Sequence, residues 1–221
     1  MDQSVKTMLE TVYGLFKAKF QDQMASWDRF LEFIAIDNIP SLLTRLGHKL
    51  DWLCNDIEFC KSILKAYDSK ALKGDYNDHL GEMYFELIQS HPELSTTGEF
   101  YSSKDIEHLI HKLNITKTEK KITVFDPAVG SGKVLMEAHK IAPKAIFFGV
   151  ESDLRLLRIA MTNFAIHEIE GYFLHADRTE HELDISTLGG QYNWQFANSL
   201  DSHIHKLKPK SGLIQTPLQT P

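Results

Sequence analysis

After residue 121, short strand-like runs alternate with helical ones, and this alternation constrains the fold more than any other feature of the sequence. Strand-like runs lie at residues 122–125, 145–150, 171–175 and 193–197, with helical runs at 132–141 and 154–168. A strand–helix–strand order of this kind predicts a parallel sheet whose crossover connections are right-handed. We therefore expect an α/β fold in this part of the chain.

The chain before this alternation predicts a separate helical domain. Within residues 1–70, apolar residues such as Leu9, Val12 and Phe16 recur at helical spacing, which indicates several packed helices. Cys54 and Cys60 lie six residues apart in one predicted helix, on different faces, so we expect no disulfide or metal pair between them. The expected parts are an N-terminal helical domain at 1–72, an α/β domain at 73–208 and a C-terminal tail at 209–221.

Composition and charge narrow the class of protein. The sequence is 43% hydrophobic and 24% charged, which is ordinary for a globular protein. We find no apolar run near the roughly 18 residues of a membrane span and no secretory signal, so we expect a cytoplasmic protein. A net charge of −6 makes the chain a weak binder of DNA on its own, because phosphate neutralisation supplies most of that affinity.

A small-residue loop follows the first predicted strand, in the sequence ITVFDPAVGSGKVLMEA at 122–138. Gly130 and Gly132 remove side chains that block a ligand from the backbone, and the amides that begin the next helix carry partial positive charge. Asp126, at the carboxyl end of the strand, can accept hydrogen bonds from an ammonium or hydroxyl group. Two glycines alone fit a tight turn without a ligand equally well.

The loop does not match the two common nucleotide-binding motifs. A dinucleotide site needs a third glycine three positions after Gly132, where this chain has Leu135. A triphosphate loop needs Gly-Lys followed by Ser or Thr, and here Lys133 precedes Val134. Both ligand classes are therefore disfavoured.

Acidic residues follow the next two strands as well. Glu151 ends the second strand, about 20 residues after the glycines, where a carboxylate suits the hydroxyls of a ribose. Asp177 follows the third strand, where it can accept a hydrogen bond from an adenine amino group. Since the carboxyl ends of parallel strands share one edge, Asp126, Glu151 and Asp177 together favour a ligand that contains adenosine.

Several segments, taken in order, resemble the amino-type (adenine-N6) DNA methyltransferases, in particular the modification subunits of type I restriction–modification systems. They are DHLGEMYFEL from Asp78, TTGEFYSSKDIEHLI around Phe100, DPAVGSGKVL from Asp126, and ESDLRLLRIAMTNFAIHEI from Glu151. This resemblance implies a Rossmann-like methyltransferase fold with S-adenosylmethionine as its cofactor. The implied cofactor-binding residues are Phe100, Tyr101, Asp126, Ala128, Gly130, Gly132, Glu151 and Asp177, of which the first two cover the methionine end.

The chain departs from that family where the target base binds. The family carries Asn-Pro-Pro-Phe or Tyr after the fourth strand, and the aromatic ring stacks on the extruded adenine. Here Asn198, the implied catalytic residue, is followed by Ser199, Leu200 and Asp201. Transfer to a base in duplex DNA needs a pocket for the extruded base, and this sequence lacks part of it.

Three functional hypotheses follow. The preferred one is an accessory or regulatory module that keeps the cofactor crevice but is inactive alone. The alternative is an active adenine-N6 methyltransferase subunit whose acceptor site a partner completes. The third is a structural relic that binds no cofactor. It is supported by two departures from the family's motifs, Lys133 in place of Gly and Ser102-Ser103 in place of Thr-Pro. The predicted strand 193–197 is an exposed sheet edge, so we also expect a protein partner or a second copy to pair with it.

Overall fold

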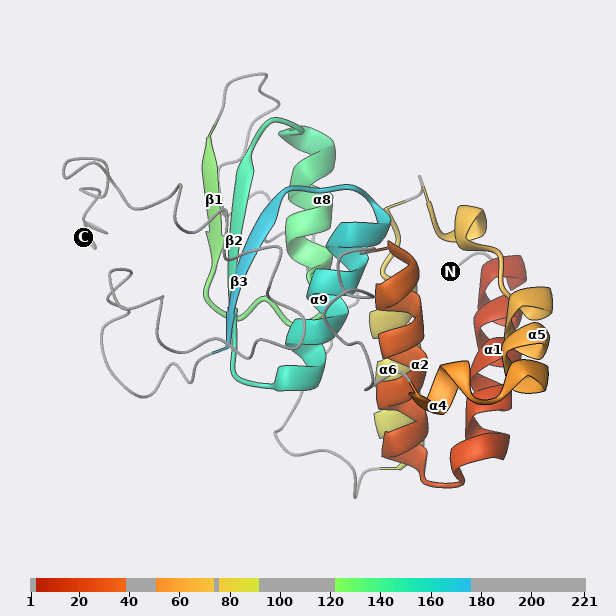
Figure 1. The fold of residues 1–221 in the computed structure, drawn as a ribbon. Helices are drawn as coiled ribbons and strands as arrows, with labels where there is room; N and C mark the ends of the chain where they lie inside the picture. The colour runs from red at the N-terminus through yellow and green to blue at the C-terminus, as the bar shows by residue number, and fades with distance from the viewer. Residues whose placement is uncertain (1–2, 39–50, 74–75, 92–121, 176–221) are drawn as a thin grey trace.

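The computed structural model describes residues 3–38, 51–73, 76–91 and 122–175, drawn in colour in Figure 1. The predicted strand at 193–197, the helices expected around 42–50 and 103–113, and the tail at 209–221 lie outside these residues.

The predicted parallel α/β fold is confirmed for the described residues. β1 (Thr123–Asp126), β2 (Ile146–Glu151) and β3 (Gly171–His175) form a sheet in the order β1-β2-β3, and both strand pairs are parallel. α8 (Lys133–Ile141) connects β1 to β2, and α9 (Leu154–Ile166) connects β2 to β3. Figure 1 shows both helices on the same face of the sheet. This arrangement brings the carboxyl ends of the strands to one edge, where the loops to α8 and α9 begin.

The N-terminal segment is helical, as expected, although its helices are divided differently. α1 (Gln3–Phe20) and α2 (Gln23–Asn38) are long, and α4 (Asp51–Cys54), α5 (Ile57–Ala66) and the 3-10 helix η2 (Ser69–Leu72) follow. The prediction of one helix through both cysteines is wrong, because the chain breaks between α4 and α5. Asp56 caps α5 there by accepting a hydrogen bond from the amide of Phe59 at 2.9 Å.

α6 (His79–Ser90) precedes the sheet in sequence but packs with the N-terminal helices. Its buried residues Leu80, Tyr84 and Leu87 belong to the same apolar cluster as Trp27 and Phe30 of α2. We call this set of buried residues the helical cluster. The predicted boundary at residue 72 thus falls between α6 and the helices on which it packs.

α9 lies between the helical cluster and the core under the sheet. Its residues Ile159 and Ile166 belong to the helical cluster, whereas Ala160 and Phe164 pack under the sheet. Arg155, near the start of α9, also pairs with Asp28 of α2 at 3.1 Å. α2 contributes to both cores as well, since Ala35 and Ile36 pack under the sheet. The helical part and the sheet are therefore joined through shared helices.

Candidate functional site

The part of the site that borders solvent, which we call the crevice side, lies where β1 and β2 end. Asp126 closes β1, and its Oδ1 accepts a hydrogen bond from the amide of Ala128 at 3.0 Å. This bond starts the turn that we call the glycine loop, residues 127–132. Asp126 is half-buried and Ala128 is exposed, so the beginning of the loop borders solvent.

Glu151 lies across from the glycine loop, as the acids at the strand ends predicted. Its Oε2 accepts a hydrogen bond from the Gly130 amide at 2.9 Å, and its Oε1 accepts from the amides of Ser152 at 2.8 Å and Asp153 at 2.9 Å. These bonds fix the carboxylate at the end of β2. Among the described residues Oε2 accepts a single bond, so a lone pair remains that fits a ribose hydroxyl.

Three backbone amides of the loop are bonded within the protein. The Gly130 amide is taken by Glu151, and the Gly132 amide donates to the Val129 carbonyl at 2.9 Å. The Val129 amide in turn donates to the Val150 carbonyl at 2.9 Å. The loop is thus fastened to the end of β2 by its own backbone.

The two glycines of the loop have different structural roles. Both have left-handed φ angles, 55° at Gly130 and 88° at Gly132, which glycine adopts without strain. A Cβ at Gly130 would meet no described atom within 4 Å, so this position borders open space. A Cβ at Gly132 would lie 3.3 Å from both Ala160 and Phe164. Gly132 therefore packs closely on α9, and the ligand access predicted for both glycines stays a prediction.

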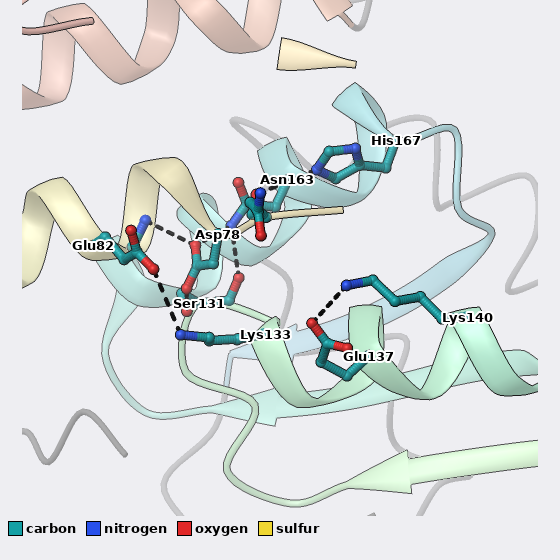
Figure 2. Close-up of polar contacts among 10 residues, drawn as sticks. Asp78, Glu82, Ser131, Lys133, Glu137, Lys140, Asn163 and His167 are labelled. Atoms are coloured by element: carbon teal, nitrogen blue, oxygen red, sulfur yellow. Dashed lines mark hydrogen bonds and ion pairs between the residues drawn. The ribbon is translucent and has the colours of Figure 1, made fainter. Parts of the chain in front are cut away.

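A buried carboxylate holds the other side of the glycine loop. Asp78, which is 1% exposed, accepts hydrogen bonds from the Gly81 amide at 2.8 Å, from Asn163 Nδ2 at 2.7 Å and from the Ser131 hydroxyl. Asn163 Nδ2 also donates to the Ser131 carbonyl at 2.9 Å. Figure 2 shows these side chains converging from α6, the loop and α9. One carboxylate thus joins three segments that are far apart in sequence.

Burial raises the pKa of the Asp78 carboxyl above its ordinary value, because the charged form loses its hydration. The three hydrogen bonds, together with the charge of Lys133, act in the opposite direction and lower the pKa. Burial is the largest of these influences, so the net direction is upward.

Lys133 also connects the loop to α6. Its Nζ lies 3.6 Å from Glu82 Oε1, one turn beyond Asp78 on the same side of α6 (Figure 2). A cation at the start of a helix is opposed by the helix dipole, and Glu82 supplies the compensating charge. Lys133, which stands where the family pattern has another residue, thus takes part in a structural contact.

Sequence reasoning missed most of this buried network. Asp78 and Gly81 were noted only as part of a resembling segment, and Ser131 and Asn163 were given no role. The available signal was Asn163, an amide in the segment IAMTNFAI of α9, where Thr162 is the other polar residue. His175, at the end of β3, was also given no role, and its Nε2 lies 2.8 Å from the carbonyl oxygen of Ser152 beside Glu151.

The structure describes five of the nine residues predicted for the site. Asp126, Ala128, Gly130, Gly132 and Glu151 lie together at the ends of β1 and β2. The predicted residues Phe100, Tyr101, Asp177 and Asn198 lie outside the described residues.

A family model for N-6 DNA methylases matches residues 75–185, which is half of the 221-residue chain. The chain belongs to the N-6 DNA methylase family. This match includes α6, the glycine loop and all three described strands. The suspected kinship with DNA methyltransferases is therefore confirmed.

The chain is also similar to a curated protein. The chain is 26% identical over 123 residues to the type I restriction enzyme MpnII methylase subunit of Mycoplasma pneumoniae. That alignment covers 51% of this chain and 23% of the relative, so the chain spans about a quarter of the relative's length.

Among solved structures, the chain is similar to a class I S-adenosylmethionine-dependent methyltransferase described from Listeria monocytogenes. The TM-score is 0.51 at 13% identity, covering 82% of this chain and 55% of the other. At that identity the likeness shows the fold, which is that of an S-adenosylmethionine-dependent methyltransferase. A type I restriction–modification methyltransferase subunit from Streptococcus thermophilus gives a TM-score of 0.41 at 18% identity, covering 80% of this chain and 39% of the other.

None of the helices in the described part of this chain is long and apolar enough to cross a membrane.

Proposed function

We propose that the chain binds S-adenosylmethionine in the crevice at the carboxyl ends of β1 and β2. The observation that carries the proposal is the placement of Glu151, whose carboxylate is fixed against the Gly130 amide with a lone pair left for a ribose hydroxyl. The open space beside Gly130 supports it, because a ligand can approach the backbone there.

The remaining roles follow the family resemblance. In this proposal Asp126, Ala128, Gly130 and Gly132 form the wall of the crevice, Phe100 and Tyr101 cover the methionine end, and Asp177 accepts from the adenine amino group. When bound, the cofactor supplies a methyl group from its sulfonium centre. The residues of this chain bind and orient it.

We propose further that the chain is an accessory or regulatory module, inactive alone, and a cytoplasmic protein. Asn198 is followed by Ser199, Leu200 and Asp201, so neither the prolines nor the aromatic residue of the family's acceptor motif is present. A module of this kind acts through others, and we propose that a protein partner or a second copy pairs with the segment 193–197. Its contact with DNA is weak alone, since the net charge is −6.

The second candidate is an active adenine-N6 DNA methyltransferase subunit that needs a partner. Asn198 favours it, because the first residue of the acceptor motif is retained. In this case the partner supplies the surface that receives the extruded base.

Calorimetric titration of S-adenosylmethionine and S-adenosylhomocysteine tests the cofactor proposal. We expect binding to the wild type and a loss of at least about tenfold in affinity for Asp126→Ala, which corresponds to about 1.4 kcal/mol. Asp68→Ala is the matched control, because Asp68 also accepts from an amide two residues ahead, that of Lys70 at 3.0 Å. The absence of binding to a folded wild type contradicts the proposal.

Methyl transfer to adenine in duplex DNA tests the accessory role. We expect no transfer by the purified chain when S-adenosylmethionine is present at saturating concentration. Transfer that is abolished in Asn198→Ala contradicts inactivity and supports the second candidate.

A further inference from the structure

We propose that Asp78 is a positioning residue of the cofactor site, which holds the glycine loop in its binding shape from the side opposite the crevice. This inference rests on the proposed function, since it concerns the same site. Asp78 itself lies on the far side of the loop from the crevice that the ligand would occupy.

The contacts of Asp78 reach the loop through Ser131 from two directions. The Ser131 hydroxyl donates to the Asp78 carboxylate, and the Ser131 carbonyl accepts from Asn163, which also donates to Asp78. The hydroxyl and the carbonyl of one loop residue are thereby fixed in a buried environment. A buried polar group that loses its partner costs about 1–3 kcal/mol, so the arrangement resists displacement.

The need for such a support follows from the other attachments of the loop. On the crevice side the loop is held by the bonds from Gly130 to Glu151 and from Val129 to Val150. The glycine at the start of α8 offers no side-chain cap. Glu151 is also the group that receives the ribose in our proposal, so it serves the ligand and the loop together. A second attachment that no ligand competes for leaves Glu151 available for binding.

The first turn of α6 is shaped around this carboxylate. A Cβ at Gly81 would lie 2.2 Å from Asp78 Oδ2, so only glycine allows the carboxylate to sit over the helix start. Leu80 and Tyr84, which lie on either side of Gly81 in α6, are buried in the helical cluster. Asp78 therefore connects the loop to α6, which packs in the helical cluster.

The test combines amide hydrogen exchange of residues 128–132 with calorimetric titration of S-adenosylhomocysteine, both on the full chain. We expect Asp78→Ala and Ser131→Ala to raise loop exchange and weaken binding by about tenfold or more, as the loss of a buried hydrogen bond implies. Asp78→Asn restores both to within about threefold, because its amide oxygen accepts as before and its NH2 donates to the Ser131 hydroxyl.

Ser26→Ala is the matched control. Ser26 is fully buried and its hydroxyl donates to the Asp22 carbonyl at 2.5 Å, within the helical part and away from the loop. We expect this variant to leave loop exchange and affinity unchanged. A merely structural role for Asp78 predicts that Ser131→Ala and Ser26→Ala behave alike at equal stability, and that result overturns the proposal.

The two readouts separate this inference from the proposed function. If the folded wild type binds no S-adenosylhomocysteine, the proposed function fails, whereas the exchange of the loop amides still reports whether Asp78 holds the loop. If the wild type binds and the loop exchanges no faster in Asp78→Ala and Ser131→Ala than in Ser26→Ala, the positioning role is contradicted. Should Asp78→Ala not fold, Ser131→Ala decides the question.

Discussion

The two sides of the glycine loop differ in how firmly they are held. On the packed side, Ser131 and Gly132 are buried against α6 and α9 and are fixed by the Asp78 carboxylate. On the crevice side, Ala128 is exposed and Gly130 borders open space, with Glu151 as the fixed carboxylate. The same short loop is thus part of the core on one side and a binding surface on the other.

This difference shows that adjacent residues of one motif serve separate purposes. Substitutions on the packed side are expected to act on stability, and on ligand affinity through the shape of the loop. Those on the crevice side are expected to act mainly on ligand affinity.

The largest effect is expected for Gly81→Ala, which we predict lowers the free energy of unfolding by about 3 kcal/mol. The added Cβ would lie 2.2 Å from Asp78 Oδ2, so the buried hydrogen bonds must break. Gly14→Ala in α1 is the control, since no atom lies within 4 Å of its added Cβ among the described residues and alanine favours the helix by about 0.5–1 kcal/mol. Urea denaturation measures both. Similar stability of the two variants would mean that the packed side is not held by the contact between Asp78 and Gly81.

Gly132→Ala is expected to lower the free energy of unfolding by about 2 kcal/mol, and Gly130→Ala by about 1 kcal/mol. Both positions have left-handed φ angles, but only an added Cβ at Gly132 presses on Ala160 and Phe164. We expect the opposite order for affinity, with S-adenosylhomocysteine binding weakened more by Gly130→Ala in the fraction that remains folded. Equal effects of both variants on both quantities would mean that the two sides of the loop are not distinct.

The pH dependence of stability isolates the charge on the packed side. Burial raises the pKa of Asp78 in the folded chain above the ordinary value near 3.9, so the native state keeps a proton that the unfolded state releases. The stability of the wild type relative to Asp78→Asn is therefore largest below about pH 4 and falls as pH rises through the raised pKa. Urea denaturation of both proteins from about pH 4 to pH 8 measures this difference. A difference that stays constant, or that grows with pH, contradicts the assignment.

The smallest effect is expected for Lys133→Met. We predict that it lowers the free energy of unfolding by less than about 1 kcal/mol, and that this loss disappears at high salt. The pair with Glu82 spans 3.6 Å and is partly exposed, and the helix dipole offsets part of its attraction. Lys61→Met is the control, because its pair with Glu58 at 2.8 Å lies on an exposed helix surface. A salt-independent loss well above that of the control would place Lys133 in the buried network.

The fold was accessible from the sequence because its signals are local. The alternation of strands and helices predicted β1, β2 and β3, and β3 has the bounds expected for it, Gly171–His175. The helix ends differ by a few residues where backbone angles decide, as at Gly132, whose left-handed φ of 88° places the start of α8 at Lys133. The break between α4 and α5 was missed because a single aspartate, Asp56, ends the helical pattern there.

The site was only partly accessible, because half of it depends on contacts between distant segments. Glu151 could be placed from strand position alone, as its distance from the loop follows from the geometry of a parallel sheet. Asp78 and Asn163 are 85 residues apart, and no local pattern shows that they meet. Sequence spacing also does not reveal that α9 lies behind Gly132.

The position of α9 between two cores has a consequence for how the chain folds during synthesis. α1, α2 and α6 leave the ribosome first, but two members of the helical cluster, Ile159 and Ile166, come from α9 much later. The apolar surface of the early helices is thus completed only once the second crossover has been made. Because contacts of such long sequence separation are costly to close, we expect the N-terminal helices and the sheet to reach their native state in one cooperative step.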